Sequence, residues 1–199
     1  MQRLYILLGF LFLLSGCSTT KPPVTEYKIV LKALDLKSDS VGCRGKSLKI
    51  SKAFSSSSLM SLQMKYVEDK HKIYEYSQAQ WIDTPNQEIS SQVVRSIRDS
   101  ELFKSTQNVK SRSRSDLVLE ISIEDFMQYY SKNLDSSYSS VAINFSLIDA
   151  RTSEVVATKT IESNVDASSL DAAGGVRALD IALSGVLSQN IEFLNEVCK

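Results

Sequence analysis

The sequence has almost no histidine: His71 is the only one among 199 residues. A serine or cysteine nucleophile needs a nearby base, and His71 stands in a polar stretch that we expect to be an exposed hairpin turn. The chain also lacks G-x-S-x-G, HExxH and CxxC motifs and a glycine-rich phosphate loop. Glu120 and Glu124 flank Ser122 on a predicted strand and indicate a wet sheet face rather than an acid pair. The sequence therefore predicts a protein that is not an enzyme and holds no metal and no cofactor.

The chain also has no excess of either charge, with 23 basic and 23 acidic residues. Removing the N-terminal segment described below takes away only Arg3 and leaves 22 basic against 23 acidic residues, a net charge of −1. A nucleic-acid partner is therefore not expected. Lys110, Arg112 and Arg114 alternate with serines, which is typical of a solvated loop.

Long apolar runs are missing except at the N-terminus, where Arg3 precedes an unbroken run over residues 4–14. As a helix this run would reach roughly 16 Å, against about 30 Å of bilayer hydrocarbon, so it predicts a cleaved secretory signal peptide instead of a membrane span.

Residues 14–17 read Leu-Ser-Gly-Cys, which matches the lipobox of bacterial lipoproteins. Cys17 is the only nucleophile there that can carry a thioether-linked lipid, and the small residues before it give a peptidase access. Ser18 follows in place of the aspartate that retains enterobacterial lipoproteins in the inner membrane. The sequence thus predicts a signal peptide over 1–16, a lipidated tether over 17–24 and an outer-membrane anchor that holds a single periplasmic domain over 25–199.

Only two cysteines remain after Cys17, namely Cys43 and Cys198. In an exported chain such a pair favours a disulfide over a metal site, the alternative being two separate buried thiols.

Periodicity predicts an α+β domain with a mostly antiparallel sheet and two helices packed on one face. The first helix is expected to begin after Thr84, which would be its N-cap, with Pro85 at the first helical position. The second helix is expected from about residue 172 to 198. Leu102 and Phe103 are expected to pack into the core after the first helix. A hairpin should join an apolar stretch at 59–67 to 73–78, and a serine-rich exposed bend is expected at 131–140. The other strands are expected at 27–31, 48–50, 117–123, 141–147 and 155–163.

Two short segments are candidates for contact with a partner or with lipid. Tyr74, Tyr76 and Trp81 form the densest aromatic cluster, which fits either core packing at the sheet edge or ligand contact. Leu59, Met60 and Leu62 follow a serine run, and an exposed Met-containing loop would be an adaptable apolar contact surface.

The order of these features resembles the ABC-type transport auxiliary lipoprotein family. The resemblance rests on the lipobox, an opening strand, an apolar segment before a hairpin, Tyr76, Trp81 and Pro85 ahead of a helix, and Leu102-Phe103 after it. This sequence departs from the family by carrying Lys65-Tyr66 and Lys72 where an arginine-rich hairpin is usual.

The resemblance implies a non-enzymatic accessory subunit of an MCE-type lipid transport system. Its partners would be an MCE-domain protein and an ABC permease/ATPase complex, and the cargo would be phospholipid or another apolar molecule. The alternative is a lipoprotein scaffold of an outer-membrane assembly machine without a transported ligand. The sequence leaves the cargo, the formation of a homo-oligomer and direct lipid contact open.

Overall fold

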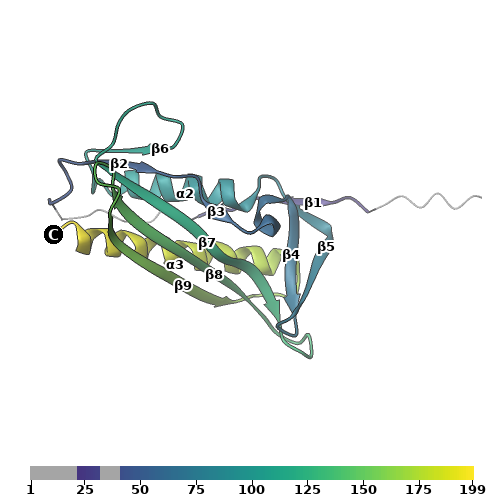
Figure 1. The fold of residues 1–199 in the computed structure, drawn as a ribbon. Coiled ribbons are helices and arrows are strands. Elements are labelled where there is room, and N and C mark those ends of the chain that lie inside the picture. The colour runs from purple at the N-terminus through teal and green to yellow at the C-terminus, as the bar shows by residue number, and fades with distance from the viewer. Residues whose placement is uncertain (1–21, 32–40) are drawn as a thin grey trace, which may run out of the picture.

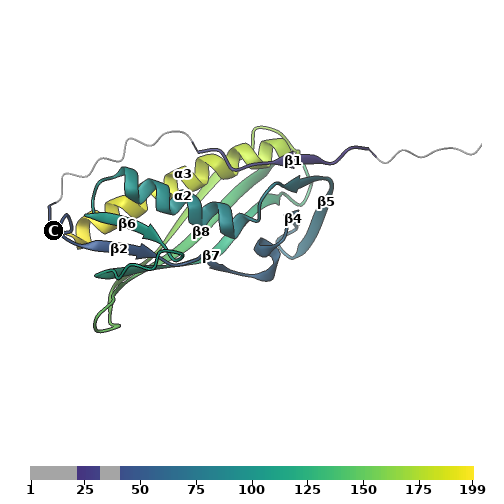
Figure 2. The same cartoon turned by 90° about the horizontal axis from the view of Figure 1, so that it is seen from above.

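The computed structural model describes residues 22–31 and 41–199, so the predicted signal peptide and Cys17 lie outside the described residues. One mixed sheet carries two helices on a single face (Figures 1 and 2). The strands are β1 Thr25–Tyr27, β2 Ser47–Ile50, β3 Phe54–Ser55, β4 Gln63–Glu68, β5 Lys72–Trp81, β6 Ser105–Asn108, β7 Leu117–Tyr130, β8 Ser137–Asp149 and β9 Val155–Asp166. The helices are the short 3-10 turn η1 Ser57–Met60, α2 Pro85–Asp99 and α3 Ala172–Val197.

The α+β class is confirmed, but the sheet is mixed, not mostly antiparallel. The long strand β7 pairs with β8 in antiparallel fashion along its whole length. On its other edge β7 pairs in turn with β2, β3 and β4, each of them parallel to it. The pairs β1–β5 and β2–β6 are parallel as well. Residue alternation reports which face of a strand is buried and carries no information on strand direction, so the sequence could not reveal this.

The first predicted strand is shorter and earlier than expected. Strand β1 ends at Tyr27, and residues 28–31 continue outside any strand. Ile29 is nevertheless buried in the core. Ile29 is therefore apolar because this segment packs against the core of the domain. A packed segment of this kind shows the same alternation of apolar and polar residues as a strand.

The serine-rich segment is also different from the expectation. The turn covers only residues 131–136, and Ser137, Ser139 and Ser140 are buried residues of β8. The Ser139 hydroxyl donates to the Gly175 carbonyl of α3 at 2.9 Å. The small Ser139 side chain thus lies against the helix, and the three serines are buried instead of solvated.

Helix α2 begins where Thr84-Pro85 predicts, but the Thr84 side chain makes no capping hydrogen bond. The Thr84 carbonyl instead accepts from the N–H groups of Gln87 and Glu88, at 2.9 and 3.1 Å. The helix buries its Ile89, Val93 and Ile97 stripe against the sheet, and Leu102 and Phe103 are buried after it as expected.

The closing helix α3 also begins and ends close to the predicted residues. Asp171 caps it by accepting from the Gly174 N–H at 2.8 Å. At its other end Cys198 forms a disulfide with Cys43, which lies 155 residues earlier, as the sequence predicts. Gly42 packs so tightly there that a Cβ atom would collide with the Cys198 carbonyl. The end of the chain is thus fixed to the start of the sheet.

Helix α3 also holds the early segment through Asp180, whose carboxylate accepts from the Val30 N–H at 3.1 Å. Burial raises the pKa of Asp180 to about 6, against the smaller opposing effect of this hydrogen bond. The unfolded chain, with an ordinary pKa of about 3.9, ionises first as pH rises. Asp180 therefore contributes stability that is present below about pH 4 and is lost as pH rises through about 6.

We expect Asp180→Asn to raise the free energy of unfolding by about 1 kcal/mol at pH 7.5, a value reduced for the partial exposure of the carboxylate. The amide oxygen can still accept from Val30. Urea unfolding at about pH 4 and pH 7.5 checks this, and a variant that gains nothing at the higher pH would contradict it.

Candidate interaction surfaces

The structure divides the predicted contact residues between the core and the surface. Leu59 and Trp81 are buried, with 6% and 5% exposed, and the Trp81 ring packs on Phe126 at 5.8 Å between centroids. These two residues therefore belong to the core, and the predicted contact surface does not include them. Met60 and Leu62 are 52% and 42% exposed, because η1 turns Leu59 inward and leaves the residues after it outside.

Met60 and Leu62 lie beside a third exposed apolar residue, Ile82, which is 50% exposed. The Trp81 N–H donates to the Leu62 carbonyl at 2.8 Å, and the Ile82 N–H donates to the Tyr27 carbonyl at 2.9 Å. These bonds place the backbone of Leu62 beside the end of β5 and Ile82 beside β1, and Met60 precedes Leu62 by two residues. We call Met60, Leu62 and Ile82 the apolar end patch.

The predicted aromatic cluster exists, with different members. Tyr66, Tyr74, Tyr76 and Tyr130 pack together, with centroids 4.6 to 5.7 Å from Tyr66 to the other three. Strand β4 lies between β5 and β7, which brings residues from three strands to one place. Tyr66 and Tyr130 were missed because the parallel β4–β7 pairing gives no local signal in the sequence.

A hydrogen-bond network fixes this tyrosine cluster. The Tyr76 hydroxyl donates to the Gln128 side chain at 2.7 Å and lies 2.8 Å from the Tyr130 hydroxyl. Gln128 in turn donates to Ser137 at 2.9 Å. Burial, and then the bond to Tyr130, raise the pKa of Tyr76. Tyr76 stays protonated, so the cluster offers packing and hydrogen bonds and no general base.

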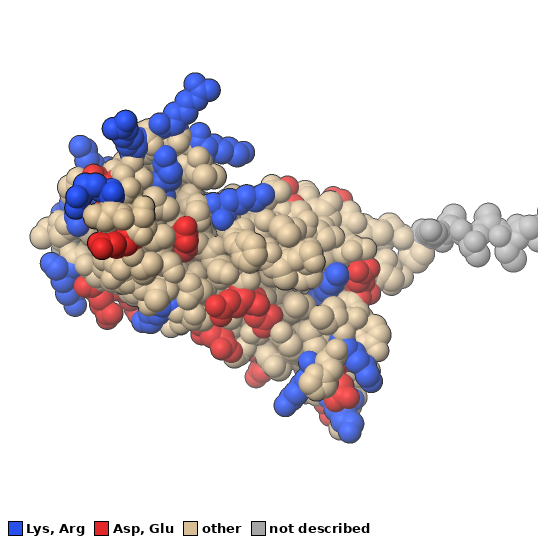
Figure 3. Space-filling view, in the orientation of Figure 1, with Lys and Arg blue, Asp and Glu red and all other residues tan. Residues whose placement is uncertain are grey.

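The face of β7, β8 and β9 that carries no helix is polar and acidic. Figure 3 shows acidic side chains over the middle of this face and basic ones toward both ends. Glu120, Glu124 and Glu162 are exposed on it, so the expectation of a wet sheet face holds. Burial raises the pKa of Asp125, which accepts a 2.9 Å hydrogen bond from Tyr129. Strand pairing has thus collected carboxylates from distant parts of the sequence.

The basic segment Lys110, Arg112 and Arg114 lies in the loop between β6 and β7, and all three side chains are exposed. Strands β6 and β7 are both parallel to β2, so this short loop must cross β2 to reach the start of β7. Lys49 of β2 donates to the Ser113 carbonyl at 2.6 Å and holds the crossing in place.

The described residues contain no group of three or more metal-ligating side chains. His71 is exposed in the β4–β5 turn. Within residues 22–31 and 41–199, no helix is long and apolar enough to cross a membrane.

No protein-family model matches the chain, and no curated protein matches it in sequence. Protein XCC0632 from Xanthomonas campestris, of family model DUF330, has a similar structure. It is 19% identical, with a TM-score of 0.76 over 87% of this chain and 96% of that one. The chain shares the fold of the DUF330 protein.

Two further structures are similar over most of their length. One, described as an uncharacterized protein, is 11% identical with a TM-score of 0.65, over 89% of this chain and 100% of that one. The hypothetical protein CT253 from Chlamydia trachomatis is 8% identical with a TM-score of 0.54, over 78% of this chain and 98% of that one. At these identities the similarity establishes the fold alone.

Proposed function

We propose that this protein is a lipid-anchored, non-enzymatic accessory subunit of an MCE/ABC-type lipid transport system at the periplasmic face of the outer membrane. The observation that carries the proposal is the position of the apolar end patch, next to the strand through which the tether enters the domain. The resemblance in the order of sequence features and the α+β fold support it.

The tether keeps the apolar end patch close to the bilayer. Residues 17–24 can reach at most roughly 28 Å when fully extended. Because β1 begins directly after them, Met60, Leu62 and Ile82 stay within that reach of the membrane. A periplasm-bridging MCE-domain protein that arrives at the outer membrane would meet this patch.

Apolar contact also suits the charge of the protein. The mature chain has almost no net charge, so its bulk electrostatics offer a partner little attraction. Three adjacent side chains, each close to half exposed, supply apolar area that is removed from water on binding, at roughly 25 cal/mol per Å².

We expect Met60→Asp to abolish association with the MCE-domain protein of the same organism. The melting temperature should change little, because Met60 is 52% exposed and contributes little to the core. Co-purification from detergent-solubilised membranes measures the association. Raising the salt concentration should not release the partner, since salt screens charges and leaves apolar contacts intact.

The matched control is Val156→Asp, the same kind of change at a residue that is 50% exposed on β9. Val156 lies just after the β8–β9 turn, away from β1, so this variant should retain the partner. Loss of association in both variants, or partner release by salt alone, would overturn the assignment of the patch.

A further inference from the structure

A groove of about 440 Å³ separates the edge of the sheet from helix α2. Helix α2 contributes Gln87, Ser91 and Val94 to one wall. Asn108, the last residue of β6, contributes to the other wall together with Val109 and Lys110, which follow it. Lys52, after β2, lies at the same groove. No aspartate or glutamate lines it. The groove therefore combines apolar contact area with positive charge.

Strand β6 forms an edge of the sheet, because its only strand partner among the described residues is β2. The Lys104 N–H donates to the Lys46 carbonyl at 2.9 Å, on the β2 side. The Asp116 N–H donates to the Ser47 carbonyl and the Ser51 N–H donates to the Leu119 carbonyl, so these two residues of the β2 segment face β7, and Leu48 and Ile50 between them face β6. The parallel register places Leu48 opposite Thr106, so Leu48 bonds to Ser105 and Gln107, and Thr106 and Asn108 direct their N–H groups to the open edge. An open edge of this kind can accept a further strand.

The surroundings of this edge are strongly basic. Between residues 104 and 116 the exposed cations are Lys104, Lys110, Arg112 and Arg114. Asp116 is the single acid, and the Ser47 N–H and hydroxyl already donate to it, at 2.7 and 2.6 Å. These hydrogen bonds keep the Asp116 pKa below its usual value.

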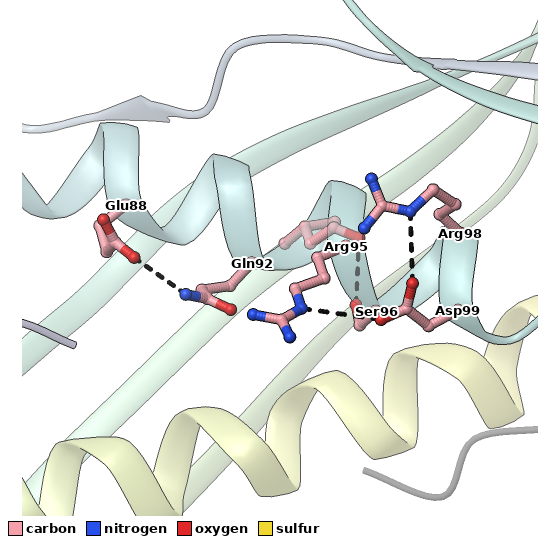
Figure 4. Close-up of polar contacts among 7 residues, drawn as sticks. Glu88, Gln92, Arg95, Ser96, Arg98 and Asp99 are labelled. Carbon is pink, nitrogen blue, oxygen red and sulfur yellow. Dashed lines mark hydrogen bonds and ion pairs between the residues drawn. The ribbon is translucent and has the colours of Figure 1, made fainter. Parts of the chain in front are cut away.

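Helix α2 adds positive charge on the same side. Gln87, Ser91, Val94 and Arg98 follow one another at spacings of four, three and four residues and so share one helix face. Figure 4 shows Arg95 and Arg98 converging on the single carboxylate of Asp99, at 3.7 and 3.3 Å. One carboxylate cannot neutralise two guanidinium groups, so this group of three side chains keeps one positive charge, and the other acids of this segment are Glu88 and Glu101.

The groove is bounded by β6, and β6 lies toward the end of the domain opposite β1, where the tether enters (Figure 1). The membrane that holds the anchor is therefore not its natural occupant. A groove between an edge strand and a helix fits an extended peptide, with the main chain on the strand and alternate side chains against the helix. The surplus of cations requires that peptide to be acidic.

We propose that the groove between β6 and α2 binds an extended acidic segment of a partner protein, which adds as a strand to the open edge of β6. This surface differs from the apolar end patch, and the proposal does not depend on the transport role. Binding here should fall steeply with salt, whereas binding at the apolar end patch should not.

The probe is a fluorescent eight-residue peptide in which valine alternates with aspartate and glutamate, titrated by anisotropy into the full chain in neutral detergent. Binding should weaken about tenfold in the Arg112→Glu/Arg114→Glu variant and about tenfold in Thr106→Pro, which removes an edge N–H that is not bonded to β2. Lys132→Glu, the same charge reversal in the β7–β8 turn, should leave binding unchanged. Hydrogen exchange of the Thr106 amide in the wild-type protein should slow when the peptide is bound.

Several outcomes would overturn the proposal. An N-methylated peptide of the same charge cannot pair as a strand, so binding as tight as that of the parent peptide would show attraction by charge alone. Anionic phospholipid vesicles that displace the acidic peptide would point to a membrane surface instead. Failure of the acidic peptide to bind, or equal binding of a version with lysine in place of the acids, would also reject it. The melting temperature of Thr106→Pro shows separately that the variant is folded.

Discussion

Cells that express Cys17→Ala are expected to accumulate the precursor form, with no palmitate label. The lipidation motif offers no other thiol to form the thioether, and the dedicated peptidase acts only after lipid transfer. Several acyl chains, at about 0.8 kcal/mol per buried CH₂, hold the wild-type protein to the bilayer permanently. The variant should lose this lipid attachment completely. Metabolic palmitate labelling measures it.

The other two cysteines provide the control for this experiment. In the Cys43→Ala/Cys198→Ala double variant Cys17 remains, so its labelling should equal that of the wild type. Palmitate that persists in Cys17→Ala would reject the anchor, whereas loss of label in the double variant would show that the assay responds to unfolding.

The same double variant carries the second large prediction, a loss of about 5 kcal/mol in the free energy of unfolding. The disulfide closes a loop of 155 residues, and in the chain-entropy model a loop of this length gives that value. For a chain of this size the melting temperature should fall by roughly 10 to 20 °C. Differential scanning calorimetry measures the change.

Reduction of the wild-type protein gives an independent measurement of the same quantity. Dithiothreitol should lower its melting temperature to that of the double variant and leave the double variant unaffected. Equal melting temperatures with and without the reductant would show that α3 is held by packing alone. Mass mapping of protein from its native host under non-reducing conditions should find Cys43 and Cys198 joined.

The elements with strong local signals were predictable from the sequence. Helix α3 has a long apolar period, and apolar and polar residues alternate over parts of the strands β7, β8 and β9, so the positions of these elements follow from burial of one face. Proline at the first helical position marked the start of α2. Parallel pairing was not predictable, because β2, β3 and β4 meet β7 only through contacts between distant parts of the sequence.

The candidate surfaces were predictable only in part, for the same reason. Hydropathy identified residues 59–62 as apolar but could not show that η1 buries Leu59 and exposes Met60. The groove beside β6 depends on a sheet edge and on one face of α2, and neither has a sequence motif. The basic residues of the β6–β7 loop were visible as a pattern, but their significance depends on the strand edge that they surround.

The disulfide also decides how the domain responds to tension on its anchor. A pull transmitted from Cys17 acts first on β1, which has only three paired residues, and next on the burial of Ile29 and the contact of Val30 with Asp180. The force then meets Cys43, which is covalently joined to the end of α3. Peeling stops there, since the remaining fold is closed by a covalent bond. The released chain from Thr25 to Cys43 would have a contour length of roughly 60 Å. The tether would lengthen by that amount less the distance that this segment spans in the folded domain, which would let the domain follow a receding partner while it stays folded.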